Sequence, residues 1–181
     1  MPPARPIPPQ NVVEAAGWYE LGAKSGDAAA QVAIGLAYLE GRGVTQDRSK
    51  AADYFEMAAA QDRPEALYNL GLLYLEGKVR ERDELKAADF FSRAAGLGNA
   101  DAQYALASMY IEGNGVIQDD AIANDWLQRA AKSGQVDAQI EYAVRLFNGV
   151  GTAADPAAAA GWFKRAAIAG MAASLLAMLF V

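Results

Sequence analysis

The chain has 181 residues, of which 53% are hydrophobic, so it can bury a sizeable core. It contains no cysteine and no histidine, which excludes disulfides and Cys-based metal sites, argues against an enzyme, and predicts no cofactor or metal. A formal net charge of −6 disfavours nucleic acid as a partner, and the absence of cysteine fits periplasm and cytoplasm alike.

The chain begins with a proline-rich segment, residues 1–10, which read MPPARPIPPQ. This composition is typical of a polyproline-like tail or linker, and it lacks the apolar stretch of a signal peptide. Its Pro-x-x-Pro spacings leave open a role as a ligand of an aromatic-lined module. Asn11, followed by Glu14, predicts the first helix start as a variant of the capping box.

From residue 11 onwards the sequence repeats with a period of 36 residues. Similar text occurs at 38–55, 74–91, 110–127 and 146–163. Such a period is typical of a solenoid of stacked repeats. The spacing predicts a half repeat at 11–26, full repeats at 27–62, 63–98, 99–134 and 135–170, and a truncated helix at 171–181. This last helix is expected to be the first helix of an unfinished repeat.

Each repeat is predicted to contain two amphipathic helices. In 63–98, apolar residues recur at helical spacing before and after a break that contains Gly77. Gly77 suits the left-handed turn that ends the first helix, and Asp83 suits the N-cap of the second. The aspartate recurs once per repeat, as Asp47, Asp83, Asp119 and Asp155. Capping explains this column without a catalytic or calcium-binding role.

Small and aromatic residues also recur once per repeat. The small residues Gly35, Gly71, Ala107 and Ala143 are expected to let the second helix approach the first closely. The large residues Tyr54/Phe55, Phe90/Phe91, Trp126 and Trp162/Phe163 are expected to fill the space between repeats, as core rather than as a cofactor-stacking stripe. Because a single repeat cannot bury its apolar faces alone, stability is expected to come from stacking.

The repeat A-x-x-x-L-G-x-x-Y-x-x-G-x-G-V-x-x-D-x-x-K-A-x-x-[YFW]-[YF]-x-x-A-A, legible between Ala30 and Ala59, resembles the Sel-one-like repeat, a relative of the tetratricopeptide repeat. The resemblance covers about 11–181. It implies an all-α fold, a right-handed superhelical solenoid of antiparallel helix pairs. It also implies a non-catalytic scaffold or adaptor that binds other proteins, notably in bacterial signalling and envelope or host-contact processes. Val79, where a second glycine is expected, departs from the pattern.

By analogy with tetratricopeptide repeats, the first helices would line a concave groove. The candidate partner-binding residues are Leu36, Glu40, Glu65, Tyr68, Leu72, Glu76, Asp101, Tyr104, Ser108 and Glu112. Two acidic rows enclose an apolar middle, so we expect a protein or peptide partner with basic and apolar residues. The alternative is that the apolar members complete the core and the carboxylates are only solvated.

The sequence leaves two further functions open. Residues 174–181, SLLAMLFV, are apolar on every side and could pair two copies as a homodimer. The uncharged stretch 166–181 is shorter than the ~20 residues that span a bilayer, so no membrane anchor is expected. A carboxylate-based hydrolase, with a pair such as Glu76 and Glu112, has less support because the sequence has no nucleotide-binding, Ser-x-x-Lys or calcium-loop motif.

Overall fold

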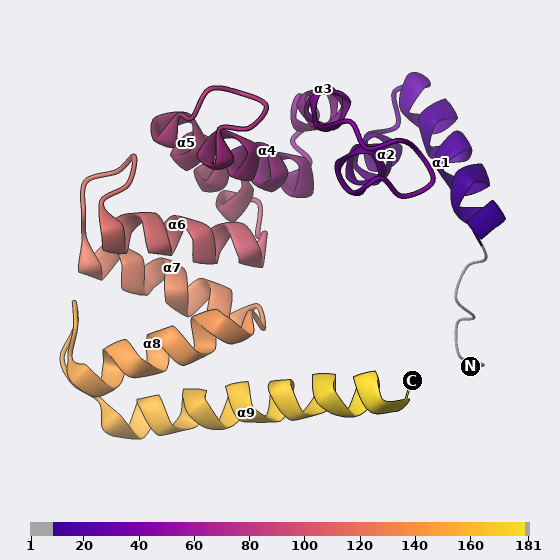
Figure 1. The fold of residues 1–181 in the computed structure, drawn as a ribbon. Helices are drawn as coiled ribbons and strands as arrows, with labels where there is room; N and C mark the ends of the chain where they lie inside the picture. Colours follow the sequence, from indigo (N-terminus) through magenta and orange to yellow (C-terminus); the bar gives the residue numbers. More distant parts are fainter. Residues whose placement is uncertain (1–8, 180–181) are drawn as a thin grey trace. The chain divides into compact units, whose positions relative to one another are not determined.

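The structure is a computed structural model that describes residues 9–179, with side chains described for 11–170. Over these residues the secondary structure is entirely α-helical (Figure 1). The helices are α1 (Pro9–Lys24), α2 (Ala28–Glu40), α3 (Arg48–Ala59), α4 (Pro64–Glu76), α5 (Glu84–Gly96), α6 (Ala100–Glu112), α7 (Asp120–Lys132), α8 (Val136–Asn148) and α9 (Pro156–Leu179). The predicted all-α fold of helix pairs with a 36-residue repeat is confirmed.

The chain divides into two compact units, Met1–Asp83 and Glu84–Val181. The first contains α1 to α4, and in it α2 packs against both α1 and α3, while α3 also contacts α4. The second contains α5 to α9, and in it α6 pairs with α7 and α8 pairs with α9. The even-numbered helices α2 to α8 are therefore the first helices of the repeats, and the odd-numbered ones are the second helices.

Predicted caps begin three of the second helices. Asp47, Asp119 and Asp155 each accept a hydrogen bond from a backbone N–H two or three residues further on, at 2.9–3.0 Å. The first helices end as predicted at glycines in the left-handed conformation, with Gly77 at φ 66°. The start of α1 differs from the prediction, because the helix begins at Pro9 and Asn11 lies inside it. Proline is well tolerated in the first helical turn, so a helix can begin within the last residues of the proline-rich segment.

The small residues allow the close packing that the sequence predicts. A Cβ atom placed on Gly35 would lie 2.7 Å from Cε1 of Phe55, so the ring of Phe55 rests directly on the α2 backbone. Phe55 and Phe91 are completely buried, as expected for core residues. Phe163, at the same position of the last repeat, is an exception because 40% of its surface is exposed.

The end of α9 differs from the prediction of a separate truncated helix at 171–181. α9 runs without interruption from Pro156 to Leu179, through the expected boundary at Gly170. At the start of other first helices, Asp27 and Asn99 cap the helix with their side chains, whereas the corresponding residue is Met171, which cannot do so. Position 171 therefore has no side-chain cap that would begin a separate helix. Among the described residues, none of the helices is long and apolar enough to cross a membrane.

Candidate protein-interaction surface

The candidate partner-binding residues fall into two groups, one in each compact unit. The first group comprises Leu36 and Glu40 on α2 together with Glu65, Tyr68, Leu72 and Glu76 on α4. The second group comprises Asp101, Tyr104, Ser108 and Glu112, all on α6. All five carboxylates are exposed, and the other five side chains are half-buried. Each group therefore combines an accessible charged edge with a partly covered middle.

In the first compact unit the carboxylates have basic neighbours. The Glu40 carboxylate forms an ion pair with Arg42. The Glu76 carboxylate lies 2.7 Å from the guanidinium of Arg48 and 3.6 Å from the ammonium of Lys78. Glu65 is paired with Arg63 at 3.6 Å. These exposed pairs are worth little to stability, so they can reorganise, but they reduce the net negative charge that this surface offers to a partner.

In the second compact unit Tyr104 connects two first helices. Its hydroxyl donates a hydrogen bond to Oε2 of Glu141 on α8, at 3.2 Å. Burial raises the pKa of Tyr104 above its ordinary value, and the nearby Glu141 carboxylate raises this pKa further. The Ser108 hydroxyl donates to the backbone carbonyl of Tyr104 at 3.2 Å, so it faces its own helix rather than a partner.

An apolar stripe on α8 is the most exposed apolar part of the described first helices. Ile140, Val144 and Phe147 are 44, 43 and 56% exposed, and their spacing of four and three residues puts them on one face of the helix. On α2, α4 and α6 the side chains at the same positions are buried or half-buried. Asp137 and Glu141, one helical turn apart, lie beside this stripe. The candidate residues predicted from the sequence did not include these five, although Asp137, Ile140 and Val144 lie one period after the candidates Asp101, Tyr104 and Ser108.

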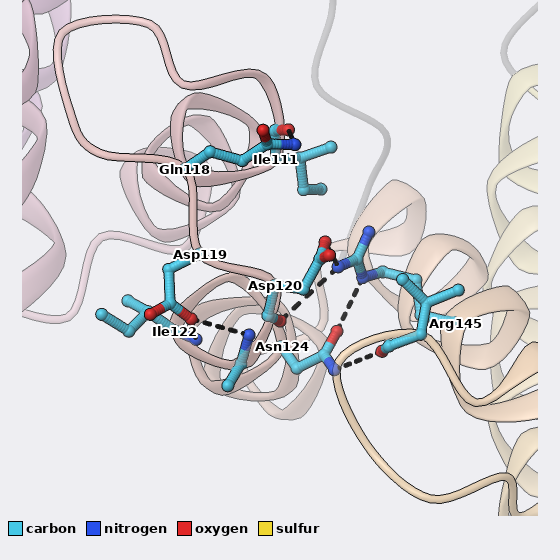
Figure 2. Close-up of polar contacts among 9 residues, drawn as sticks. Ile111, Gln118, Asp119, Asp120, Ile122, Asn124 and Arg145 are labelled. Carbon is cyan, nitrogen blue, oxygen red and sulfur yellow. Dashed lines mark hydrogen bonds and ion pairs between the residues drawn. The ribbon is translucent and has the colours of Figure 1, made fainter.

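Behind the stripe, a polar cluster holds α8 in place (Figure 2). The buried guanidinium of Arg145 donates from Nε to Oδ1 of Asn124 on α7 at 2.6 Å, and it forms an ion pair with the carboxylate of Asp120. The amide of Asn124 donates in turn to the backbone carbonyl of Val150, at 2.7 Å, in the loop after α8. The α8 surface is therefore fixed to α7 and to its own following loop.

This polar cluster was missed from the sequence, although it left a signal there. At the position of Arg145 the earlier repeats have Met109, Leu73 and Ala37, and at the position of Asn124 they have Ala88 and Ala52. Two polar residues thus replace apolar ones in facing columns of neighbouring repeats. Paired departures of this kind indicate a contact, and a search for them would have found the cluster.

The described residues contain no group of three or more acidic side chains arranged to hold a metal ion. The Glu112 carboxylate accepts a hydrogen bond from the amide of Asn114 at 2.6 Å, and it is exposed like that of Glu76. What this arrangement offers is an accessible surface of apolar side chains and carboxylates on helices whose backbones are held by caps and packing.

Comparison with known protein families identifies the same repeat. The Sel1 repeat family matches the chain five times, at residues 6–27, 28–62, 64–99, 100–135 and 136–171. None of the curated proteins searched matches the chain.

Several solved structures are similar. A protective antigen present in uropathogenic Escherichia coli strains, displaying an SLR fold, is 33% identical with a TM-score of 0.81, over 86% of this chain and 33% of that one. A Sel1 repeat protein from Oxalobacter formigenes is 30% identical with a TM-score of 0.80, over 87% of this chain and 63% of that one. Helicobacter pylori cysteine rich protein B, 23% identical over 72% of this chain and 94% of that one, shares the fold with a TM-score of 0.59.

This chain therefore spans about a third of the Escherichia coli antigen and less than two thirds of the Oxalobacter protein. The five matched repeats nevertheless cover nearly all of its own length. The chain belongs to the Sel1 repeat family.

Proposed function

We propose that this protein is a non-catalytic scaffold that binds a segment of a partner protein along its first helices. Sel1 repeat proteins are generally protein-interaction scaffolds. The observation that carries the proposal for this chain is the exposed apolar stripe Ile140, Val144 and Phe147, which lies on a helix that the Arg145 cluster holds rigidly. A rigid apolar surface binds well because little side-chain and backbone freedom is lost on binding.

The partner segment is proposed to combine apolar and basic residues. Burial of the stripe supplies affinity in proportion to the apolar area removed from water. Asp137 and Glu141 on α8, with Asp101 and Glu112 on α6, give this compact unit a cluster of carboxylates around its first helices. Basic residues flanking an apolar anchor would be attracted to these carboxylates, which adds specificity and a faster association.

In the first compact unit we propose the same role, with a weaker preference for charge, for Leu36, Tyr68 and Leu72. Their half-buried side chains offer less apolar area than the α8 stripe. The glutamates beside them already pair with Arg42, Arg63, Arg48 and Lys78. A basic partner must displace these cations, which offsets part of its own attraction.

No observation favours a hydrolase over this scaffold. Hydrolysis by two carboxyl groups needs one of them held in an environment that keeps it protonated. Glu76 is exposed and paired with Arg48 and Lys78, and Glu112 is exposed and accepts from Asn114. These surroundings suit solvated carboxylates.

The proposal is tested by selecting short displayed peptides on the full chain and measuring their affinity for two variants. Val144→Asp with Phe147→Asp places charge in the stripe, and we expect it to weaken binding at least about tenfold. Ile117→Asp changes an exposed apolar residue of the loop between α6 and α7 and serves as the matched control, with unchanged binding expected. We also expect the selected peptides to contain Lys or Arg beside apolar residues, and their affinity to fall with added salt.

Two outcomes would contradict the proposal. Peptides that bind the stripe variant as tightly as the wild type would remove α8 from the binding surface. Selected peptides without basic residues, with affinities independent of salt, would show that the carboxylates take no part. Far-ultraviolet circular dichroism of each variant separates either result from unfolding.

A further inference from the structure

A second apolar site lies at the other end of the chain. Between α1 and α2, in the first compact unit, is an open pocket of about 250 Å³, lined chiefly by Val12, Ala15 and Tyr19 of α1 and by Ala33, Leu36 and Ala37 of α2. The charged residue in its lining is Arg42, whose guanidinium is paired with Glu40. Apart from Leu36, none of the lining residues belongs to the partner-binding surface proposed above.

The repeat shows what this pocket is built to receive. Tyr19 lies one period before Phe55, two before Phe91 and three before Leu127. Those three side chains are completely buried, whereas Tyr19 is 45% exposed. Phe55 is covered by Gly35 of the first helix in its own repeat. Among the described residues, no first helix covers Tyr19 in this way, so the pocket has the shape of a site where a first helix packs.

A contact on α8 supports this assignment independently. Ala33 in the pocket corresponds to Glu141, which accepts a hydrogen bond from Tyr104 of the preceding first helix, α6. This column therefore faces the first helix of the repeat before it. The α1 side of the pocket is the surface on which the first helix of the same repeat would pack. The α2 side is the surface that would contact the first helix of the preceding repeat.

One segment of the chain has the pattern of a first helix without occupying that place. Residues 171–181 align with α6 when a deletion of two residues after Gly170 is allowed. Leu176 and Ala177 then match Leu106 and Ala107, the large and small pair that packs on a second helix. Both Leu106 and Ala107 are buried in α6. The segment carries no charge, which suits an apolar pocket. Its backbone is helical to Leu179 as a straight continuation of α9, so it does not turn back to pack on α8 as a first helix.

We propose that residues 171–181 of one copy occupy the α1/α2 pocket of a second copy, with Ala177 over Tyr19. The half repeat formed by α1 is completed by a first helix from another molecule, antiparallel to α1 like every first and second helix of the fold. Such an interface joins two different surfaces, so it leaves a free pocket and a free segment at the ends of each assembly. The chains associate head to tail, and the end of α9 in one copy serves as the missing first helix of the half repeat in the next.

The test is sedimentation equilibrium of the full chain and of three variants. Tyr19→Glu puts a charge in the pocket, and Leu176→Glu puts one in the segment. We expect the wild type to exceed the single-chain mass of 19.1 kDa increasingly with concentration, and each variant alone to associate at least about tenfold more weakly, because an unpaired charge would be buried. Trp18→Glu changes the exposed neighbour of Tyr19, which does not line the pocket, and should behave as the wild type.

Mixing the two variants identifies the interface. The Tyr19→Glu chain keeps an intact segment and the Leu176→Glu chain keeps an intact pocket, so an equimolar mixture should form a pair of two chains and nothing larger. A wild type that stays at the single-chain mass at every concentration would overturn the proposal, with the pocket empty or filled from within the same chain. A Tyr19→Glu variant that assembles like the wild type would also overturn it, in favour of pairing between two 171–181 segments. Circular dichroism confirms that all variants keep their helix content.

Discussion

At the scale of single residues, the Arg145 cluster is the clearest departure from the repeat. Burying a guanidinium is costly unless its hydrogen bonds are satisfied, and here Asn124 and Asp120 satisfy them. Each of these three side chains depends on the others. The presence of Asn124 where the earlier repeats have alanine is therefore explained only by its contact with Arg145. The cluster is thus a coupled replacement of apolar contacts by polar ones, between α7 and α8.

The first prediction at this scale follows from that coupling. Arg145→Met introduces the residue that the third repeat has at this position, but it leaves the buried amide of Asn124 short of a partner. We expect it to lower the free energy of unfolding by about 1–3 kcal/mol. Adding Asn124→Ala restores the alanine of the earlier repeats and should recover most of the loss. Urea unfolding of both variants measures this, and a double variant as unstable as the single one would show that the two residues are not coupled.

Three buried glutamines show a periodic feature that sequence reasoning overlooked. The side-chain amides of Gln31, Gln103 and Gln139 each donate to a backbone carbonyl eight residues earlier, at 3.1–3.3 Å. They recur at the 36-residue period, with Leu67 in the second repeat. Each bond ties a first helix to the end of the helix before it. The available signal was a glutamine that recurs at one position of the repeat. Only the geometry shows which backbone carbonyl each glutamine amide contacts.

At the scale of elements, the second glycine in the loop after a first helix is required by packing as well as by the turn conformation. Gly115 has a left-handed φ of 67°, as a turn would require. A Cβ atom on it would also collide with the backbone carbonyl of Glu84, at the start of α5. The glycine therefore allows the loop after α6 to lie directly against the start of the preceding second helix, which links neighbouring repeats within the second compact unit.

This double constraint makes Gly115 sensitive to substitution. We expect Gly115→Ala to destabilise the protein by about 1–3 kcal/mol, because both the backbone conformation and the close approach are lost. Gly96→Ala, at the end of α5, is the matched control, since its Cβ would meet nothing within 4 Å and its φ is not positive. That variant should be neutral or slightly more stable. Equal urea midpoints for the two variants would show that the loop can move away from α5 at no cost.

The second repeat shows how an element tolerates the loss of this glycine. Val79 stands in its place, and the following Arg80 reaches back to the carboxylates of Asp53 and Glu56 on α3, at 3.1 and 3.0 Å. The sequence shows this departure from the repeat pattern. It could not predict the ion pairs, because which acidic residues Arg80 meets depends on the path of the loop in space.

At the scale of the whole molecule, the period predicts the contacts that neighbouring repeats share. It does not predict which side chains are exposed because no helix packs over them. Phe55 and Phe91 were expected in the core and are buried, whereas Phe163, in the same column, is exposed. The exposure of the α8 stripe could not be predicted for the same reason, since its counterparts on the other first helices are partly covered. The exposure of a residue in a repeat protein depends on which helices pack around it, and identical columns therefore differ along the array.

The same dependence predicts a gradient of local stability along the first compact unit. Each repeat of a solenoid is stabilised mainly by its neighbours, and in this unit α1 packs chiefly on α2, while α2 lies between α1 and α3. Backbone amides of α1 should therefore exchange with solvent faster than those of α2 and α3, through local opening that leaves the rest folded. Hydrogen exchange followed by mass spectrometry at low protein concentration measures the order of protection.

A concentration series of the same exchange experiment joins this gradient to the head-to-tail assembly. If the 171–181 segment of a second copy fills the pocket beside Tyr19, α1 gains a second neighbour, and its amides should become more protected as the protein concentration rises. In Tyr19→Glu the slow exchange of α2 and α3 should persist while α1 stays fast at every concentration. Uniform exchange across α1, α2 and α3 at low concentration would mean instead that the unit opens all at once, and that nearest-neighbour packing does not set its stability.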